Sequence, residues 1–576
     1  MGTFIRLVEY DSPAKKKDNF GNSSNEYVVN ERDFYGAPGN SYAYWINKKY
    51  LKAYADSEKI EKYITTFQGI ISGNNDILLR LWHEVSKDKI PFDIETIDEV
   101  DLQKQYWIPY NKGGTFRKWY GIQDYVINWE NGPDDKTRGK KGFSKYYLNP
   151  YVAWSYTVSG SIATRYYQPG FLWDVRGSGI FGKHEDIVYL AALISSKPSF
   201  EFFKIDSSVM SCQVENILNL PIKIQDKTTI VELAEKNIEI AKEEWDEFEI
   251  SWNYKEHPLL SGGNSYMAVL IEDRYKEYAK KCDERFQRMK SNEIKLNEDF
   301  IGIYGLDGEL DANVSDEDIT LRKADLVREI KSLISYAVGC IMGRYSLKEE
   351  GLIFAGGTWE ENRYSSDFMP CEFGVLPITE EQFFEEDLCT RVIDFIKVVY
   401  GEDTLTENLK FVASALKPDS FEAPKKIIRE YLFNEFFDNH YQIYQHRPIY
   451  WQLDSGKAGG FRAIVYMHRF TENTLPLVRT EFIQDLRYKY EEEMQRQKGR
   501  LEGASSTAEA NAIKKDIAAL DKKIVECAAY DELLNHATSS IQNYLFDLDD
   551  GVKTNYAKFL SIDGDKNSNI LTVVKL

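Results

Sequence analysis

Residues 106–129 read YWIPYNKGGTFRKWYGIQDYVINW, and this stretch decides the fold of the surrounding chain. Aromatic side chains alternate with polar ones on either side of the glycines, a pattern typical of short strands joined by turns. The same alternation extends over residues 104–182. Residues 184–204, which follow, are expected to form a helix that packs on the sheet. The sequence therefore predicts a mixed α/β domain in this part of the chain.

Two further segments lie before this domain. Residues 1–10 (MGTFIRLVEY) are expected to form a strand. Residues 57–87 have a helical pattern that is interrupted at Gly73–Asn75. Because glycine and asparagine favour turns, the sequence predicts a helical segment with a loop in its middle.

The rest of the chain is predicted to be mostly helical. Apolar side chains spaced by three and four residues form one stripe from Val231 to Trp252, with no proline or glycine between them. Residues 321–342 form a second strong helical pattern, and residues 380–445 read as several helices. A short strand is expected around Phe461–Met467.

The last two helical segments are expected to form an antiparallel hairpin. Apolar side chains recur every four residues from Phe482 to Met494, and every three or four residues from Ile513 to Cys527. A turn of mostly small residues, Gly503–Thr507, joins the two segments. Because both polar faces mix the two charge signs, we interpret the hairpin as a charged packing arm rather than a membrane or partner helix.

The composition limits the possible classes of protein. The chain has 576 residues and a formal net charge of −20, which argues against a general polyanion binder. Its six cysteines include no CxxC pair, so the pattern favours neither a zinc knuckle nor a disulfide framework. No apolar run approaches the length of a membrane span, and the N-terminus has no apolar signal core. We therefore expect a reducing cytoplasm.

Three local motifs point to ligands, and each has a plainer interpretation. Gly177–Gly182 matches the dinucleotide pattern GxGxxG, but no run of alternating strands and helices precedes it. We expect this glycine turn to lie at a helix N-terminus and to offer N–H groups to a DNA phosphate instead. Asn149-Pro150-Tyr151 lacks the second proline of an amino-methyltransferase loop and is interpreted as an Asn-Pro turn. Asp563–Asn567 lacks the glycine and glutamate of a calcium loop, and no metal site is predicted.

The strongest candidate for DNA binding is the basic, aromatic stretch already quoted. Residues 111–145 contain eight basic residues and four acidic ones. The basic residues are Lys112, Arg117, Lys118, Lys136, Arg138, Lys140, Lys141 and Lys145. Lysine and arginine contact phosphates, and arginine also reads guanine. The alternative, which stays open, is that the rings fill a core and the basic residues are merely solvated.

Several strings in the chain resemble a known family. Among them are Trp107-Ile-Pro-Tyr-Asn-Lys-Gly-Gly114, Leu81-Trp-His-Glu-Val85, Arg447-Pro-Ile-Tyr-Trp451 and Tyr466-Met-His-Arg469. The chain resembles the C-terminal part of the PglX adenine-specific DNA methyltransferases of BREX phage-defence systems. The resemblance covers essentially the whole chain. In that family a Rossmann-like methyltransferase domain that uses S-adenosylmethionine comes first, and a target-recognition region follows.

The resemblance implies a fold class and a division of the chain. The expected class is α+β, with a mixed α/β target-recognition domain followed by a mainly helical region that ends in a long hairpin. Residues 1–50 would be the end of the methyltransferase fold and a linker. The further divisions are 51–225 for target recognition, 226–345 for a helical spacer, 346–480 for a helical C-terminal domain and 481–576 for the hairpin and tail.

The resemblance also implies a function. The chain is expected to be the DNA-binding specificity portion of a methyltransferase whose S-adenosylmethionine domain is missing, through truncation or a split or rearranged gene. We expect no cofactor in this chain and no methylation by it alone. The candidate DNA contacts are Lys112, Arg117, Lys118, Trp119, Arg165, Ser178, Gln68, Asn74 and Asn75. Expected partners are double-stranded DNA, other BREX proteins and a phage DNA-mimic inhibitor, with no membrane. The alternative is a scaffold that docks other defence subunits or a separate methyltransferase chain.

Overall fold

The computed structural model describes residues 1–30, 44–67, 69–92, 94–96, 99–130, 145–157, 161–206, 211–260, 269–540, 544–545 and 547–576. The chain forms two compact units that are interleaved in sequence. Unit 1 contains residues 1–79, 91–245 and 283–322, and unit 2 contains residues 80–90, 246–282 and 323–576. These units do not follow the five consecutive divisions expected from the sequence, because the chain returns to unit 1 inside a long helix.

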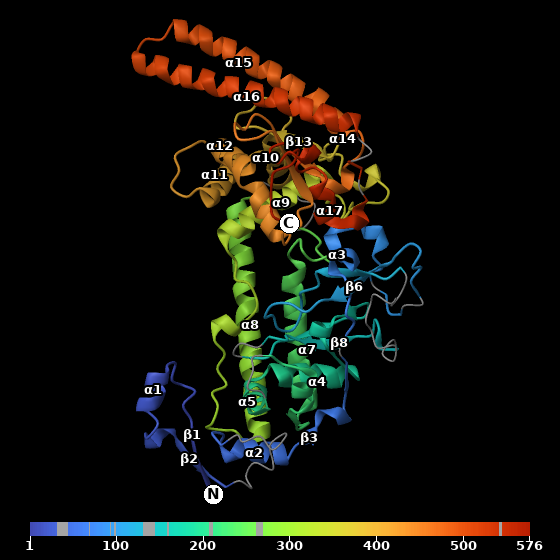
Figure 1. Ribbon diagram of the computed structural model, residues 1–576, viewed down its shortest axis with the longest axis vertical. Helices are drawn as coiled ribbons and strands as arrows, with labels where there is room; N and C mark the ends of the chain where they lie inside the picture. Colours follow the sequence, from blue (N-terminus) through green and yellow to red (C-terminus); the bar gives the residue numbers. More distant parts are fainter. Residues whose placement is uncertain are drawn as a thin grey trace. The chain divides into compact units, whose positions relative to one another are not determined.

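Unit 1 combines small sheets with helices (Figure 1). Its strands are β1 (Gly2–Ile5), β2 (Glu26–Val29), β3 (Glu58–Lys59), β4 (Thr65–Phe67), β6 (Trp107–Asn111), β7 (Tyr125–Asn128), β8 (Tyr151–Trp154), β9 (Thr164–Tyr167), β10 (Leu172–Trp173), β11 (Gly179–Phe181) and β12 (Pro221–Ile222). Its helices are α1 (Pro13–Asp18), α2 (Lys48–Ala55), α3 (Asn75–Leu78), α4 (His184–Ser195), α5 (Lys197–Asp206), α6 (Val214–Leu218), nearly all of α7 (Lys227–Asp246) and the later part of α8 (Ile271–Tyr304). Strand β5 (Leu79–Leu81) crosses the boundary between the units.

Two sheets organise unit 1. In one, β6 lies between β10, to which it is parallel, and β7, to which it is antiparallel. In the other, the strands follow the order β4-β11-β8-β9 and every pair is antiparallel. The short strands predicted within residues 104–182 are therefore confirmed. So is the strand predicted at the N-terminus, which is β1.

Helix α4 covers the second sheet, as the sequence predicted, by packing against β8 and β9. All eight of its residues from Ile187 to Ile194 are buried, and Glu185 and Asp186 lie in the first turn, where carboxylates favour a helix. The predicted single helix is two helices, and Pro198 lies in the first turn of the second one, where its missing N–H costs no intrahelical hydrogen bond. The chain is already extended at Ser196, where ψ is 157°, and α5 then begins.

The helical prediction for residues 57–87 is wrong. Its described residues contain β3, β4 and β5, and the four-residue α3 is the one α-helix among them. Strand β4 consists of Thr65, Thr66 and Phe67, and β-branched and aromatic side chains favour strands. Its pairing with β11 decides the local structure over the helical spacing of the apolar residues.

Unit 2 places helices around one antiparallel sheet in the order β13-β15-β14. The strands are β13 (Val375–Ile378), β14 (Tyr450–Asp454) and β15 (Arg462–Tyr466). The helices are α9 (Leu326–Met342), α10 (Leu388–Tyr400), α11 (Leu405–Leu416), α12 (Pro424–Asn434), α13 (Phe436–Ile443), α14 (Thr474–Leu477), α15 (Gln484–Glu502), α16 (Thr507–Ser539) and α17 (Gly551–Ala557). The helices predicted in residues 321–342 and 380–445 and the strand near Phe461–Met467 are confirmed.

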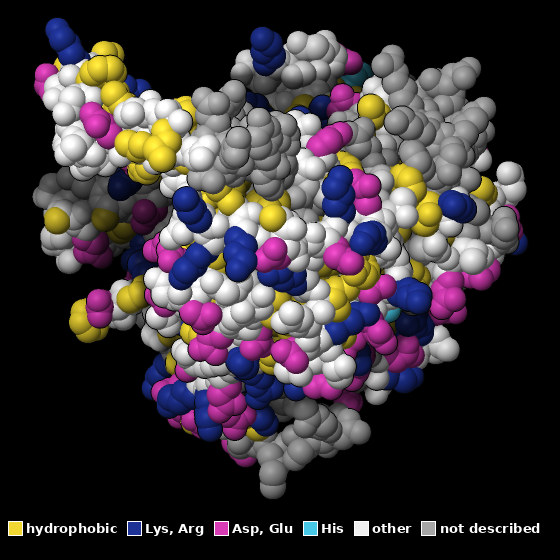
Figure 2. Space-filling view, turned by 90° about the horizontal axis from the view of Figure 1, so that it is seen from below, with side chains coloured by type: hydrophobic (Ala, Val, Ile, Leu, Met, Phe, Trp, Pro, Cys, Tyr) yellow, Lys and Arg dark blue, Asp and Glu magenta, His cyan; other side chains and the backbone are white. Residues whose placement is uncertain are grey.

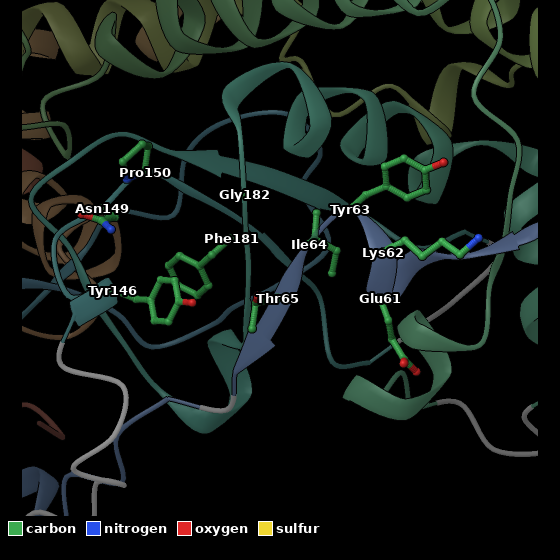
Figure 3. A pocket seen from close by; sticks show the side chains of 10 residues that line it. All are labelled: Glu61, Lys62, Tyr63, Ile64, Thr65, Tyr146, Asn149, Pro150, Phe181 and Gly182. Atoms are coloured by element: carbon green, nitrogen blue, oxygen red, sulfur yellow. The ribbon is translucent and has the colours of Figure 1, made fainter.

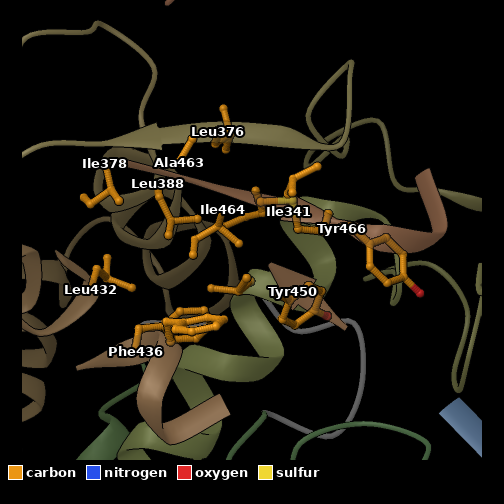
Figure 4. Close-up of a cluster of buried hydrophobic side chains, with 14 of the residues drawn as sticks. Ile341, Leu376, Ile378, Leu388, Leu432, Phe436, Tyr450, Ala463, Ile464 and Tyr466 are labelled. Carbon is orange, nitrogen blue, oxygen red and sulfur yellow. The ribbon is translucent and has the colours of Figure 1, made fainter. Parts of the chain in front are cut away.

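The core of unit 2 lies between this sheet and its helices. Figure 4 shows Leu376 of β13 and Ile464 of β15 facing Leu388 of α10 and Leu432 of α12. All four side chains are buried. Helix α9 completes this core, and it ends at Gly343, whose φ of +82° is the left-handed conformation that glycine adopts most readily.

The predicted C-terminal hairpin is confirmed. Helices α15 and α16 pack against each other, with residues 503–506 as the turn between them. The Ser506 hydroxyl accepts a hydrogen bond from the Glu509 backbone N–H and so begins α16. The predicted α+β class is confirmed as well. Within the described ranges, no helix is both long enough and apolar enough to span a bilayer.

Candidate nucleic-acid interface

Two loops of unit 1 leave its first sheet at the same edge. Leu172 of β10 pairs with Tyr110 of β6, and Trp173 pairs with Asn111, in parallel. Because parallel strands end on the same side of a sheet, residues 112–116 and 174–178 emerge next to each other. This placement is a consequence of strand direction and does not depend on the loops themselves.

A third loop joins them through residues 69–70. The Ile70 N–H donates to the Trp173 carbonyl at 2.8 Å, and the Tyr110 hydroxyl donates to the Ile70 carbonyl at 2.8 Å. Gly69 allows this approach, because a Cβ on this residue would lie 2.0 Å from the Trp173 carbonyl oxygen. We call residues 69–77, 112–116 and 174–178 the loop edge.

The Asp174 carboxylate ties the loop edge together. It lies 2.9 Å from the Tyr110 hydroxyl, whose single hydrogen it shares with the Ile70 carbonyl, and it accepts a hydrogen bond from the Arg176 backbone N–H at 2.9 Å. It also forms an ion pair with the Lys112 ammonium at 2.5 Å. Burial, and then the Asp174 charge, raise the pKa of Tyr110 far above its ordinary value, so its hydroxyl remains a donor. Asp174 therefore bonds directly to the loops of residues 112–116 and 174–178 from a buried position, and it reaches the loop of residues 69–77 only through the Tyr110 hydroxyl.

Several polar side chains on this framework face solvent. Asn74, Asn75, Thr115 and Arg176 are exposed, while Lys112 is partly exposed. Arg176 has no ion pair with any of the described residues. Two large apolar side chains flank the asparagines, with Ile71 47% and Ile77 57% exposed. The loop edge thus presents amides, a hydroxyl, a guanidinium and two apolar side chains on a rigid base.

The expected exposed cationic surface around residues 117–119 is wrong. The Arg117 guanidinium lies 2.6 Å from the Glu244 carboxylate of α7, and the Lys118 ammonium lies 2.7 Å from Glu293 of α8. The indole N–H of Trp119 donates to the same Glu293 at 2.7 Å. All three side chains are buried, so their donors are already used inside unit 1.

The Arg117–Glu244 pair is stabilised by a second arginine. Burial alone would raise the pKa of the Glu244 carboxyl, but the charges of Arg117 and Arg322 outweigh burial and hold this pKa below its ordinary value. The Arg322 guanidinium lies 3.3 Å from the other carboxylate oxygen. Glu244 is therefore ionised and paired at neutral pH.

Two further predicted contacts also face inward. Arg165 is completely buried, and its guanidinium donates to the Arg117 carbonyl and to the Ser155 hydroxyl, both at 2.9 Å. The Ser178 hydroxyl is buried and donates to the Val175 carbonyl at 2.8 Å. Both side chains hold the backbone of this region in place. Gln68 lies outside the described residues, as do Lys136, Arg138, Lys140 and Lys141.

Two curated proteins are similar in sequence to this chain. No family model matches the chain. It is 36% identical over 599 residues to the adenine-specific methyltransferase PglX of Lacticaseibacillus casei (strain Zhang), in an alignment that covers 100% of this chain and 49% of PglX. It is 32% identical over 595 residues to the adenine-specific methyltransferase BrxX of Escherichia coli O9:H4 (strain HS), covering 96% of this chain and 47% of BrxX.

The chain corresponds to a C-terminal portion of the PglX-type adenine-specific methyltransferases. The resemblance inferred from the motifs is therefore confirmed. The chain spans about half the length of the curated relatives it matches.

The glycine motif of this chain is not a dinucleotide fingerprint. Gly179–Phe181 forms β11, a strand antiparallel to both of its neighbours, at the place where the fingerprint has a glycine turn that leads into a helix. Helix α4 begins at His184, where the sequence predicted it, and its N-cap Lys183 directly follows the motif. Gly177 instead allows close packing, since a Cβ there would lie 2.8 Å from Asn111 atoms.

The predicted Asn149-Pro150 turn is confirmed. The Asn149 N–H donates to the Tyr146 carbonyl at 3.2 Å, and β8 begins at Tyr151. Tyr151 is completely buried and stacks on Tyr167 with ring centroids 5.0 Å apart, so its ring is unavailable to a base.

A cavity of about 380 Å³ lies beside this turn. Figure 3 shows the rings of Tyr146 and Phe181 next to each other on one side of it and Lys62 and Glu61 on the other. The two ring centroids are 5.3 Å apart, and Tyr146 also packs on Phe67 at 4.6 Å. These rings therefore already have aromatic neighbours, and the cavity lies outside the loop edge.

Basic and acidic side chains are mixed on the surface of this PglX-type chain. On the face drawn in Figure 2, lysine and arginine alternate with aspartate and glutamate, and no large area of one sign is visible. Among the described residues, no group of three or more His, Cys, Asp or Glu side chains is placed to hold a metal ion. The loop edge is accordingly the arrangement that best fits recognition by hydrogen bonding.

Proposed function

We propose that unit 1 is the DNA-binding, target-recognition part of a PglX-type adenine-specific methyltransferase, and that the loop edge contacts the duplex. An enzyme that methylates adenine at a chosen site must hold DNA and distinguish its sequence. The relatives carry the name of such enzymes, and this chain matches about half of their length. The methyl transfer itself, with S-adenosylmethionine, would belong to the part of the protein that precedes this portion.

The observation that carries this proposal is the joining of three loops, two of them by bonds to Asp174 and the third through the Tyr110 hydroxyl and the Trp173 carbonyl. Recognition loops read DNA well when a rigid scaffold positions them. Here Tyr110, Lys112 and the Arg176 backbone all bond to one buried carboxylate. The exposed side chains of the same loops are then held at fixed positions before DNA arrives.

The exposed side chains are chemically suited to base edges and phosphates. The amide of asparagine can form two hydrogen bonds with adenine in the major groove, which suits Asn74. The Arg176 guanidinium can bind a phosphate or the two acceptors of guanine. Ile71 and Ile77 can contact thymine methyl groups. Of the residues predicted from the sequence, Lys112, Asn74 and Asn75 keep a direct role in this proposal.

The buried residues of the original prediction have a supporting role. Arg117, Lys118 and Arg165 bond to neighbouring carboxylates and carbonyls beneath the surface. They hold residues 115–119 next to β9, through the Trp119 N–H and the Thr164 carbonyl at 2.6 Å. Ser178 similarly fixes the third loop. Their replacement would disturb DNA binding through the loop backbone.

Duplex binding by a paired variant tests the proposal. We expect the chain to bind a mixed-sequence duplex of about 30 base pairs, with an affinity that falls as salt rises. The double variant Asn74→Ala/Arg176→Ala should bind more weakly, and its log–log salt slope should be smaller by about 1, because one phosphate contact is lost.

The matched control removes two side chains elsewhere on unit 1. Lys52 and Lys59 are exposed residues of α2 and β3, outside the loop edge. The Lys52→Ala/Lys59→Ala variant should bind the duplex as the unmodified chain does. Equal loss in both variants would show that binding follows overall charge and would refute the loop-edge assignment.

A further inference from the structure

Unit 2 contains a cavity that the proposed DNA contact does not use. Its volume is about 750 Å³, and most of its wall is apolar. Phe354, Trp359, Phe373 and Leu477 supply apolar surface, and Glu372 and Glu481 supply carboxylates. The cavity is larger than one side chain needs and lies within the range of protein sites that bind ligands.

One wall of the cavity is held rigidly by Arg469. Its guanidinium lies 4.1 Å from the centre of the Trp359 ring and donates to the carbonyls of Cys371 at 2.8 Å and Glu372 at 2.6 Å. Gly374, with φ of +67°, leaves room for it, because a Cβ there would lie 2.8 Å from the Arg469 side chain. The Arg469 guanidinium is therefore held in place at this wall by its contacts with Trp359 and the two carbonyls.

The other face of Trp359 is occupied too. Tyr364 stacks on this ring with centroids 4.8 Å apart, and Phe354 meets its edge at 5.1 Å. A planar ligand thus cannot stack on Trp359. The cavity therefore suits bulky apolar side chains better than a planar ligand that needs an aromatic ring to stack on.

Phe373 is an exposed apolar side chain at the cavity. Its side chain is 46% exposed, although it lies next to an aromatic wall. A single exposed apolar side chain is common on protein surfaces, but Phe373 continues the apolar wall formed by Phe354, Trp359 and Leu477, and a contiguous apolar area of this kind marks an interaction site. Covering Phe373 would remove apolar area from water, which favours association.

The opposite wall contains an irregular helix. Residues Val478–Ile483 form a π-helical turn between α14 and α15, and Thr480 and Glu481 of this turn line the cavity. Single π-turns inside α-helices occur frequently at functional sites. Here the turn sets Thr480 and Glu481 at the cavity and leaves both exposed.

The charge at the rim identifies the kind of partner. Glu372 and Glu481 are exposed, and no cation pairs with either of them among the described residues. The nearby Arg469 is bonded to backbone carbonyls. The Arg469 charge is not cancelled by these neutral carbonyls, so the cavity carries two carboxylates against one guanidinium and has an excess of negative charge, on a chain whose net charge is −20. A partner with lysine or arginine beside its apolar side chains would be complementary.

We propose that this cavity docks a segment of another protein that carries large apolar side chains next to basic ones. The apolar side chains fill the space lined by Phe354, Phe373 and Leu477. The basic side chains lie at the rim with Glu372 and Glu481. This inference goes beyond the DNA-binding proposal, since it concerns a different unit and a different chemistry.

A peptide selection tests this proposal. The full chain is used to select binders from a random library of displayed peptides of about twelve residues. We expect enriched peptides with aromatic or large aliphatic residues beside lysine or arginine. Phe373→Ala should weaken their binding by about tenfold or more, because the apolar contact is lost. Glu372→Gln/Glu481→Gln should weaken it several-fold at low salt and less at high salt.

Phe421→Ala is the matched control, because Phe421 is a fully exposed phenylalanine of the same unit that does not line the cavity. It should leave peptide binding unchanged. The proposal is overturned if no peptides are enriched, or if their binding ignores Phe373→Ala. It is also overturned if N-acetyltryptophanamide displaces the peptides with equal affinity, because the cavity would then be a small-molecule site.

Discussion

The Arg117 guanidinium lies 2.6 Å from the Glu244 carboxylate, and both side chains are almost completely buried. Arg117 belongs to the basic stretch that most resembles a DNA-binding surface, yet its charge is neutralised by helix α7. The centre of the Trp245 ring, in the same helix, lies 5.0 Å from the guanidinium carbon. The pair therefore fastens the loop of residues 115–121 to α7 and supports the loop edge from beneath.

Removing one member of this pair should destabilise unit 1 strongly. Arg117→Ala leaves the Glu244 charge buried with one fewer partner, and breaking such a pair costs about 3–5 kcal/mol. Replacing both residues, as in Arg117→Met/Glu244→Leu, should cost less, because Arg322, which then loses Glu244, is partly exposed and can be solvated. Urea unfolding of the two variants measures this difference. Equal destabilisation by the single and double variants would contradict a buried, coupled pair.

The same carboxylate predicts an acid dependence of stability. The pKa of Glu244 is lower in the folded chain than its ordinary value, so the folded state favours the ionised form. The resulting stability is present above the unfolded pKa of about 4.3 and is lost as pH falls through the lower folded pKa. Glu244→Gln should therefore be less stable at pH 7 but lose less further stability below about pH 4.3. Parallel curves of unfolding free energy against pH for the two proteins would be inconsistent with this assignment.

A single methyl group should disturb the junction of the three loops. Gly69→Ala places a Cβ against the Trp173 carbonyl, so one of the backbones must move. We expect a loss of about 1–3 kcal/mol in unfolding free energy together with weaker duplex binding. Gly302→Ala in α8 is the control, since nothing lies within 4 Å of its added Cβ. If Gly69→Ala binds DNA normally, the close approach of the loops is not needed for recognition.

Asn74 should contribute to sequence preference more than to affinity. Selection of duplexes from a random pool by the unmodified chain should enrich a preferred sequence that includes adenine. Asn74→Ala should relax the preference at one position by about 1–3 kcal/mol, while its salt slope stays the same, because an amide carries no charge. A variant that keeps every preference of the unmodified chain would exclude Asn74 as a base reader.

The short strands within residues 104–182 and the helices within residues 321–342, 380–445 and 482–527 could be predicted from local pattern alone. Alternation around Tyr106–Trp129 and the spacing from Phe482 to Cys527 both gave the correct elements. Residues 57–87 could not be predicted in this way, because β4 owes its conformation to pairing with β11, more than 100 residues away. In the same way, the burial of Arg117 and Lys118 depends on ion pairs with Glu244 and Glu293, which are distant in the sequence.

A signal for those two carboxylates was nonetheless present in the sequence. Glu244 follows Ala241 by three residues and precedes Trp245, so it lies beside the apolar stripe of α7 rather than on its solvated face. A carboxylate at such a position requires a buried partner. A search for that partner among the basic residues would have cast doubt on the prediction that residues 117–119 form an exposed cationic surface. The parallel β6–β10 pair that creates the loop edge left no comparable signal, since β10 has only two residues.

Cross-linking from position 74 tests the central claim most directly. All six natural cysteines are buried, so Asn74→Cys introduces an exposed thiol that can carry a photo-activated cross-linker. The same label at Lys59→Cys gives the comparison. With a bound mixed-sequence duplex, we predict cross-links from position 74 and none from position 59. Binding of the duplex with cross-links from position 59 and none from position 74 would contradict the account.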